Sequence, residues 1–339
     1  MKQKLLGMSP AELKEAAVRI GLKPYAGKQL AEWMYVRRVR SFEDMTNISK
    51  EGRAALADAY DLGTSAPLEV HVSSDGTKKY LFGFDGKSSV ESVVIPEEDR
   101  KTLCVSSQSG CKMGCRFCMT GRQGFHGNLS TADILNQFIS VDETHGLTNA
   151  VFMGMGEPLD NFDNVMKAIE VLTSDWGFAW SPKRVTLSTI GVLPNLKRYL
   201  DGCRCHIAVS LHNPFAEERA SMMPVQKAWP ATEILDLLRT YDFTGQRRVS
   251  FEYTMFAGFN DDKVHADALV RLLRGLECRV NLIRFHRIPD FPYEPSDQHV
   301  MEAFRDRLSR QGVTCTIRAS RGEDIFAACG LLAGKHDKD

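Results

Sequence analysis

Residues 109–120 read Ser-Gly-Cys-Lys-Met-Gly-Cys-Arg-Phe-Cys-Met-Thr, which spaces Cys111, Cys115 and Cys118 as CxxxCxxC. Most [4Fe–4S] clusters are held by four cysteine thiolates. Three thiolates hold three irons and leave the fourth iron open to a ligand that is not protein. The spacing therefore predicts a reactive cluster rather than one that only carries electrons. Zinc is the alternative. Zinc sites usually combine two short motifs that each supply two cysteine or histidine ligands, and no second CxxC or HxxxH occurs.

The overall composition is that of a globular protein. The chain has 339 residues, of which 43% are hydrophobic, and its 43 basic and 43 acidic residues give zero net charge. This length fits one large α/β domain with a smaller appendage, and the charge excludes a global electrostatic grip on nucleic acid. Two arginine clusters remain, Arg37 with Arg38 and Arg40, and Arg284 with Arg287. Their simplest interpretation is a solvated face.

The number and spacing of the cysteines help to indicate the cellular compartment. The start of the chain lacks an apolar core of signal-peptide length, and no apolar run approaches the ~18 residues of a membrane span. We expect a cytoplasmic protein without membrane contact, in which thiols stay reduced and clustered cysteines indicate metal binding or catalysis. Four cysteines outside any motif are expected to be small buried or half-buried hydrophobic residues: Cys203, Cys205, Cys278 and Cys315.

Residues 1–65 are expected to form a small helical domain. Ser9-Pro10 predicts a capped helix start with proline in the first turn. Apolar residues at helical spacing in 30–34 mark a second helix, and Ser41 is predicted to cap a third.

Residues 66–98 have a different character. Asp-Gly pairs at 75–76 and 85–86 separate runs rich in β-formers at 68–72, 79–84 and 90–95. Asp-Gly between such runs is a strong hairpin signal, so this segment predicts a short antiparallel β extension.

Residues 99–339 alternate between strand and helix patterns. Six βα units predict a parallel sheet with right-handed crossovers, either doubly wound or curled into a partial barrel. In a barrel, reactive residues gather at the carboxyl ends of the strands, and the cysteine loop follows the first predicted strand. The predicted strands are 102–106, 150–155, 184–188, 206–211, 249–255 and 279–285.

CxxxCxxC with Phe117 before the last cysteine resembles the signature of the radical S-adenosylmethionine (SAM) superfamily. Further segments resemble the RlmN/Cfr family, which methylates adenine carbons in RNA: LCVSSQSGC (103–111), GMGEPLD (154–160), TLSTIG (186–191), VSLH (209–212) and AACG (327–330). GKQLAEWMY (27–35) and FEDMTNISK (42–50) resemble the RlmN branch. The likeness runs from about residue 5 to 333. It implies an α/β fold, a radical SAM partial (β/α)6 barrel with an N-terminal helical accessory domain that binds RNA.

The resemblance implies a [4Fe–4S] cluster whose open iron binds SAM. It assigns seven strand-end positions to SAM: Gly156, Glu157, Ser188, Ser210, Leu211, His212 and His286. Without the resemblance, polar caps at strand ends would be the simpler explanation for these side chains. At His286 the chain departs from the asparagine of well-known members, although an imidazole can still donate or accept one hydrogen bond.

The resemblance also implies two further functional cysteines. Adenine carbon 2 is not nucleophilic, and the family uses a cysteine, here Cys329, to carry the methyl carbon after a first SAM has methylated it. A radical from a second SAM then activates this methyl group for addition to the base. Cys104 matches the cysteine that releases the product through a transient disulfide. Glu91 matches the proton acceptor, although an outward glutamate in an edge strand is the commoner explanation.

The expected substrates are an adenine in the peptidyl-transferase region of 23S rRNA and the adenine 3′ of the anticodon in tRNA, both methylated on carbon 2. The expected electron donor is a protein such as flavodoxin, and we expect a monomer. Cfr-type methylation of carbon 8 of the same rRNA adenine is the alternative, which the two RlmN-like N-terminal segments disfavour. A non-catalytic RNA-binding protein with a structural metal is a remote alternative.

Overall fold

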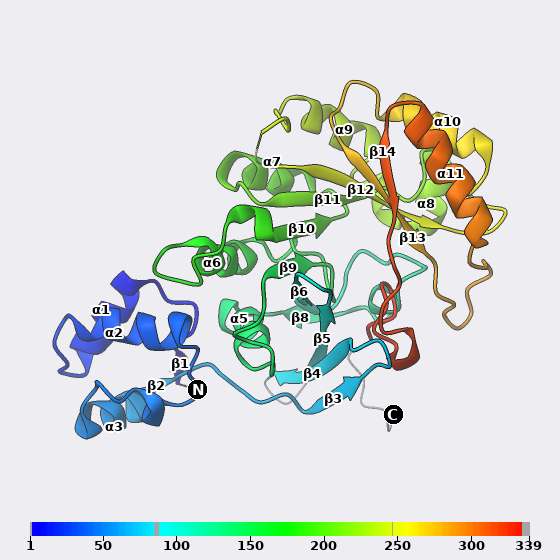
Figure 1. Ribbon diagram of the computed structural model, residues 1–339. Helices are drawn as coiled ribbons and strands as arrows, with labels where there is room; N and C mark the ends of the chain where they lie inside the picture. The colour runs from blue at the N-terminus through cyan, green and yellow to red at the C-terminus, as the bar shows by residue number, and fades with distance from the viewer. Residues whose placement is uncertain (1, 85–87, 246, 334–339) are drawn as a thin grey trace.

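The centre of the molecule is one mixed β-sheet that curls without closing (Figure 1). The computed structural model describes residues 2–84, 88–245 and 247–333. Within these ranges the ten strands lie in the order β14-β13-β12-β11-β10-β9-β6-β5-β4-β3, with β14 and β3 at the two ends. The parallel strands are β6 (Lys101–Cys104), β9 (Asn149–Phe152), β10 (Val185–Thr189), β11 (His206–Ser210), β12 (Val249–Met255), β13 (Arg279–Arg284) and β14 (Thr314–Ile317). This linear order confirms the predicted α/β partial barrel.

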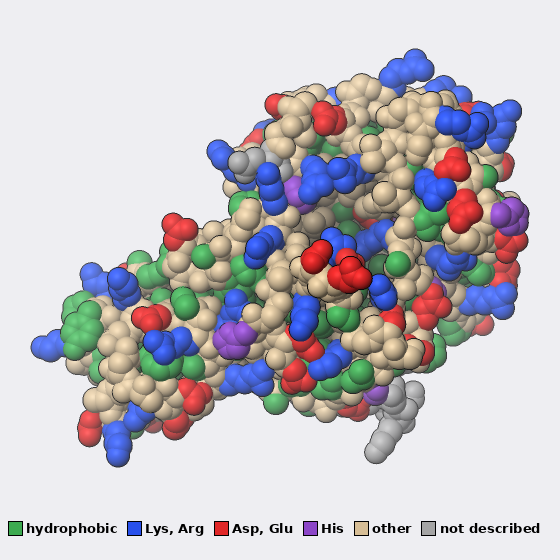
Figure 2. Space-filling view, in the orientation of Figure 1, with side chains coloured by type: hydrophobic (Ala, Val, Ile, Leu, Met, Phe, Trp, Pro, Cys, Tyr) green, Lys and Arg blue, Asp and Glu red, His purple; other side chains and the backbone are tan. Residues whose placement is uncertain are grey.

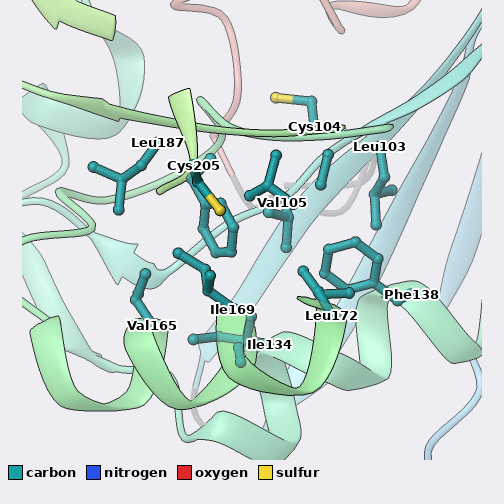
Figure 3. Close-up of a cluster of buried hydrophobic side chains, with 14 of the residues drawn as sticks. Leu103, Cys104, Val105, Ile134, Phe138, Val165, Ile169, Leu172, Leu187 and Cys205 are labelled. Carbon is teal, nitrogen blue, oxygen red and sulfur yellow. The ribbon is translucent and has the colours of Figure 1, made fainter. Parts of the chain in front are cut away.

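Helices connect the parallel strands: α5 (Thr131–Ile139), α6 (Phe162–Thr173), α7 (Leu193–Gly202), α8 (Ala216–Met222), α9 (Ala231–Arg239), α10 (Lys263–Leu272) and α11 (Gln298–Arg310). Their apolar sides pack on the sheet, as Figure 3 shows for α5 and α6 beneath β6 and β10. Ile134, Phe138 and Ile169 there meet Leu103 and Leu187, all at most 3% exposed. In the described part of the chain, no helix combines the length and apolarity that crossing a bilayer requires.

The predicted antiparallel extension is present and joins the barrel sheet. It consists of β3 (Glu69–Val72), β4 (Lys78–Phe84) and β5 (Ser88–Pro96), and the predicted turn at Asp85-Gly86 lies outside the described residues. Because β5 also pairs with β6, it is an inner strand rather than an edge.

The N-terminal segment is helical, as predicted, but its third helix begins later than Ser41. Helix α1 (Pro10–Arg19) has a capping box between Ser9 and Glu12, and α2 (Ala26–Ala31) continues into a π-helical turn (Glu32–Val36). Ser41 caps only a 3-10 turn (Phe42–Asp44), whereas α3 (Lys50–Ala59) is capped by Ser49. Two short parallel strands, β1 (Gln3–Lys4) and β2 (Tyr60–Asp61), close this segment.

Two of the arginines expected to lie on a solvated face instead contact the barrel. The Arg38 guanidinium donates to the Thr144 carbonyl and lies 4.2 Å from the centre of the Phe178 ring. Arg40 Nη2 donates to the Val141 carbonyl at 3.0 Å. Both side chains thus bind the loop that follows α5 and join the N-terminal segment to the barrel, which a purely solvated face would not do.

The other arginines of the two clusters differ among themselves. Arg37 is exposed and pairs with Glu32 at 3.2 Å, and Arg287 is exposed and pairs with Glu294. These two fit the solvated faces expected from the sequence. Arg284 instead lines the central cavity of the barrel.

Replacing Arg38 and Arg40 together by alanine is expected to lower the free energy of unfolding. Hydrogen bonds from charged groups contribute roughly 1.5–3 kcal/mol each, and less where the group is exposed, as Arg40 is. We therefore expect a loss of about 2–4 kcal/mol. Urea denaturation measures this loss. Arg37→Ala is the matched control, because an exposed ion pair contributes at most about 1 kcal/mol. Equal stability of the double variant and wild type would contradict the docking role.

Candidate active site

The cysteine loop starts from a small hairpin that the sequence patterns did not predict. β7 (Gln108–Gly110) pairs with β8 (Phe125–Asn128), and the Cys111 N–H donates to the Gly124 carbonyl at 2.8 Å. Gly110 has φ +69°, and a Cβ there would lie 1.9 Å from the Gly124 carbonyl oxygen, so only glycine fits. Cys118 ends the loop as the residue before α4 (Met119–Arg122).

The three thiols of this loop are partly sheltered and influence one another. Burial, with smaller contributions that include the Cys118 thiol, raises the pKa of Cys111 to about 12 and that of Cys115 well above its usual range. Among the described residues, no three His, Cys, Asp or Glu side chains are already arranged as a metal site. The donor set itself, three thiols and no carboxylate in one loop, fits an iron–sulfur cluster.

The C-terminal segment is bound to the cysteine loop. Met119 N–H donates to the Gly330 carbonyl at 2.8 Å, and Thr120 Oγ1 donates to the Leu332 carbonyl at 2.7 Å. These bonds hold Cys329, which is exposed, within electrostatic range of Cys118.

Cys104 and Cys329 are neighbours although 225 positions separate them in the sequence. Figure 3 shows the Cys104 sulfur on the opposite side of β6 from Leu103 and Val105, which pack toward the helices, as strand alternation requires. Burial, with a smaller contribution from the Cys329 thiol, raises the pKa of the Cys104 thiol to about 12. All nine cysteines are free thiols here, and Cys203, Cys205 and Cys315 are buried as expected.

Arg318 is the cation beside these two thiols. Burial disfavours its charge, but Cys329, Glu252 and Cys104 outweigh this effect and raise its pKa. Its Nη1 lies 3.5 Å from a Glu252 carboxylate oxygen. The sequence patterns did not single out Arg318, since a lone arginine after a short strand carries no motif.

Glu91 lies on β5 and is 3% exposed. Its carboxylate pairs with Lys79 at 2.9 Å and accepts a hydrogen bond from the Ala333 N–H at 2.7 Å. The alternative of an outward glutamate on an edge strand is therefore wrong. The carboxylate also links the antiparallel extension to the segment that carries Cys329.

Gly156 and Glu157 follow β9. Gly156 has φ +97°, and a Cβ there would lie 2.5 Å from the Gln108 side chain, so glycine permits this close approach to the hairpin. The Glu157 carboxylate accepts hydrogen bonds from Thr189 Oγ1 at 2.6 Å and from the Ile190 N–H at 3.0 Å. Burial raises its pKa to about 7. Glu157 therefore ties the ends of β9 and β10 together, whatever else it binds.

Ser188 lies within β10, and Ser210, Leu211 and His212 end β11. His212 has φ +57°, and its Nδ1 accepts from the Thr254 N–H at 3.0 Å, which leaves the proton of the neutral ring on Nε2. Burial, with a smaller effect from Arg219, lowers its pKa to about 3.

Arg219 is a second residue that sequence patterns missed. It is 1% exposed, and its guanidinium donates to the carbonyls of Ser210 at 3.0 Å and Leu211 at 3.1 Å. Its charge also acts on Cys115. Arg219 thus connects the end of β11 to the cysteine loop.

His286 follows β13 and lines the same cavity as Cys329 and Arg318, a space of about 550 Å³ inside the barrel. Its Nε2 lies 3.1 Å from Ser320 Oγ, and burial lowers its pKa. The predicted residues therefore form two neighbouring groups. In the first group, Cys329 and His286 line the cavity, and Cys104 and Glu91 lie beside the segment that carries Cys329. In the second group, the strand-end residues near Arg219 and Glu157 lie next to the cysteine loop.

Comparison with known proteins agrees with this arrangement. The radical SAM superfamily model matches residues 105–269, and the model of the ribosomal RNA large subunit methyltransferase N-terminal domain matches residues 3–61. A "Probable dual-specificity RNA methyltransferase RlmN" of Porphyromonas gingivalis W83 is 61% identical over 97% of this chain and 96% of its own.

More distant relatives agree. The "Dual-specificity RNA methyltransferase RlmN" of Syntrophus aciditrophicus is 40% identical over 97% of this chain and 95% of its own. The crystal structure of a radical SAM methyltransferase from Sphaerobacter thermophilus superposes with a TM-score of 0.94 at 35% identity, covering 98% of this chain and 100% of that one. The chain belongs to the RlmN family of dual-specificity radical SAM RNA methyltransferases.

Proposed function

We propose that the chain methylates carbon 2 of adenine in RNA and that Cys329 carries the methyl carbon. The observation that carries this proposal is the attachment of the C-terminal segment to the cysteine loop through Met119 and Thr120. These bonds keep an exposed thiol near Cys118 and Cys104, as a carrier cysteine requires.

Cys111, Cys115 and Cys118 would hold the [4Fe–4S] cluster, and the seven strand-end positions from Gly156 to His286 would hold SAM. Together these groups supply a methyl group and a carbon radical that removes a hydrogen atom. The role of the chain is to position the reacting atoms and to exclude water. Glu157 and Arg219 support this role, because each fixes a strand end next to the cysteine loop.

Cys329 accepts the methyl group on Sγ and carries the carbon to adenine. After the carbon has bonded to the base, Glu91 accepts the proton from carbon 2. The unpaired electron of the adduct would return to the cluster that would be held by Cys111, Cys115 and Cys118. Cys104 Sγ, as a thiolate, then attacks Cys329 Sγ and forms a disulfide. The bond between the Cys329 sulfur and the transferred carbon breaks with its electron pair on that carbon, which takes up a proton to become the methyl group. A cellular dithiol reduces the disulfide for the next cycle. The cation Arg318 favours the thiolate that this attack requires.

We propose three units: a helical RNA-binding domain at 1–65, the β extension at 66–98 and the catalytic domain at 99–339. The substrates are 23S rRNA in its peptidyl-transferase region and tRNA at the adenine 3′ of the anticodon. We further propose a cytoplasmic monomer that receives electrons from a protein such as flavodoxin.

The position of the methyl group is tested by nucleoside mass analysis. RNA from cells that lack the protein is expected to lose 2-methyladenosine from 23S rRNA and from tRNA, and a plasmid copy of the gene is expected to restore it. A methyl group on carbon 8, restored by the same plasmid, would instead establish the Cfr-type alternative.

A further inference from the structure

The amino-terminal end of the barrel carries a group of cations that the proposed chemistry does not use. Lys183 and Arg184 precede β10, Arg248 precedes β12, and Arg279 begins β13. All four side chains are exposed, and all four line the cavity that contains Cys329. Figure 2 shows lysine and arginine side chains around the hollow in the middle of the molecule, with acidic side chains at its lower rim. We call these four residues the cationic mouth.

Two carboxylates that line the same cavity pair with other arginines: Glu97 with Arg100 at 2.6 Å, and Glu252 with Arg318 at 3.5 Å. In the described ranges none of the four residues of the cationic mouth forms an ion pair. The imidazole of His206 lies among them, 3.3 Å from Arg248 Nη2. Burial lowers the pKa of His206 to about 4, and the charges of Arg248, Lys183 and Arg279 contribute to this shift.

Unpaired cations around a cavity attract a polyanion. Adjacent strands lie about 4.8 Å apart, so cations on the strands from β10 to β13 extend over roughly 15 Å. The cavity behind them, about 550 Å³, has the size of a ligand pocket. A base that reacts inside an enzyme must leave its stack and enter such a pocket, while its phosphates remain outside.

We propose that the cationic mouth binds backbone phosphates of the RNA substrate next to the adenosine that enters the cavity. This inference rests on the proposed function, because it requires an RNA whose base reaches Cys329. An acidic electron-donor protein is the other polyanion to consider. It would need to approach the cysteine loop, which lies at the carboxyl ends of the strands, and the cationic mouth lies at the opposite ends. The position therefore favours RNA.

The test is binding of a synthetic tRNA anticodon stem–loop, with adenine 3′ of the anticodon, at several salt concentrations. The variant is Arg184→Gln with Arg279→Gln. Each phosphate contact contributes about 0.7 to the slope of log affinity against log salt. We therefore expect a slope that is shallower by about 1.4 and an affinity about tenfold lower near 0.15 M salt. Arg184→Lys with Arg279→Lys is expected to stay within about threefold of wild type, since lysine keeps the charge.

Arg271→Gln with Arg274→Gln is the matched control, because it removes the same charge from exposed positions in and just after α10. It is expected to bind RNA like wild type. Unchanged affinity and slope in the Arg184/Arg279 variant would overturn the inference, and slower reduction by flavodoxin in that variant would assign the mouth to a protein partner instead. Equal losses of RNA affinity in the lysine and glutamine variants would also overturn the inference, because the lysine variant keeps the charge. Failure of the proposed function is a separate result, namely RNA that binds to wild type but is never methylated.

Discussion

Cys329→Ala is expected to abolish RNA methylation, with a loss of at least about 10⁴-fold, as for other enzymes that lose their nucleophile. The variant has no thiol at the end of the cavity to accept the methyl carbon. The cysteine loop and the strand-end residues are unchanged, so SAM cleavage after chemical reduction is expected to continue. Methylated RNA and 5′-deoxyadenosine are both measured by mass spectrometry in the same reaction.

Cys278→Ala is the control for this substitution, since Cys278 is half-buried at the residue before β13 and has no role in the account. It is expected to methylate RNA like wild type. Product formation by Cys329→Ala at more than a few per cent of the wild-type rate would show that the methyl carbon does not pass through this residue.

Cys104→Ala is expected to stop the reaction one step later, with the RNA still attached to the protein. Cys329 can load the carbon and add it to adenine, but no thiol remains to attack the Cys329 sulfur. We expect free methylated RNA to fall by at least about 10²-fold and a covalent protein–RNA species to accumulate. A denaturing gel shows this species as a slowly migrating band that disappears on ribonuclease treatment.

Cys205→Ala is the matched control for Cys104→Ala, because both cysteines are buried, Cys104 at the end of β6 and Cys205 just before β11, but the Cys205 sulfur points into the helix-side cluster (Figure 3). It is expected to form product without a retained adduct. If Cys104→Ala releases product at the wild-type rate, another group breaks the adduct and the role given to Cys104 is wrong.

The parallel strands were predictable because each is a short apolar run followed by an amphipathic helix. All six predicted strands are present, within a few residues of their expected bounds. β14 was missed because Thr314–Ile317 contains two threonines and lies half exposed at the end of the sheet, so it lacks the apolar run that marks the other strands. The predicted start of the third helix was wrong because Ser41 and Ser49 are both residues that commonly cap helices, and the sequence does not show which of them caps α3. The burial of Met45 and Ile48, which lie between them, depends on tertiary packing.

The site was predictable only where a motif or the family resemblance marked it. The three cysteines of the loop stand out by spacing alone, and the resemblance implied that the non-catalytic alternative was wrong, as the family assignment confirms. Glu91 was ambiguous because no local pattern shows that β5 pairs with β6 or that Ala333 returns to the carboxylate. Arg219 and Arg318 were missed for the same reason, since their partners lie far away in the sequence or are backbone carbonyls.

The central claim is that the carbon added to RNA comes from Cys329. The most direct measurement loads the protein with ¹³C-methyl SAM, removes the free SAM, and confirms the label on the Cys329 peptide by mass spectrometry. A single turnover is then started with unlabelled SAM, reductant and RNA. The account predicts that the first methyladenosine formed carries ¹³C and that the label leaves Cys329. Unlabelled product, with the ¹³C still on Cys329, would contradict it.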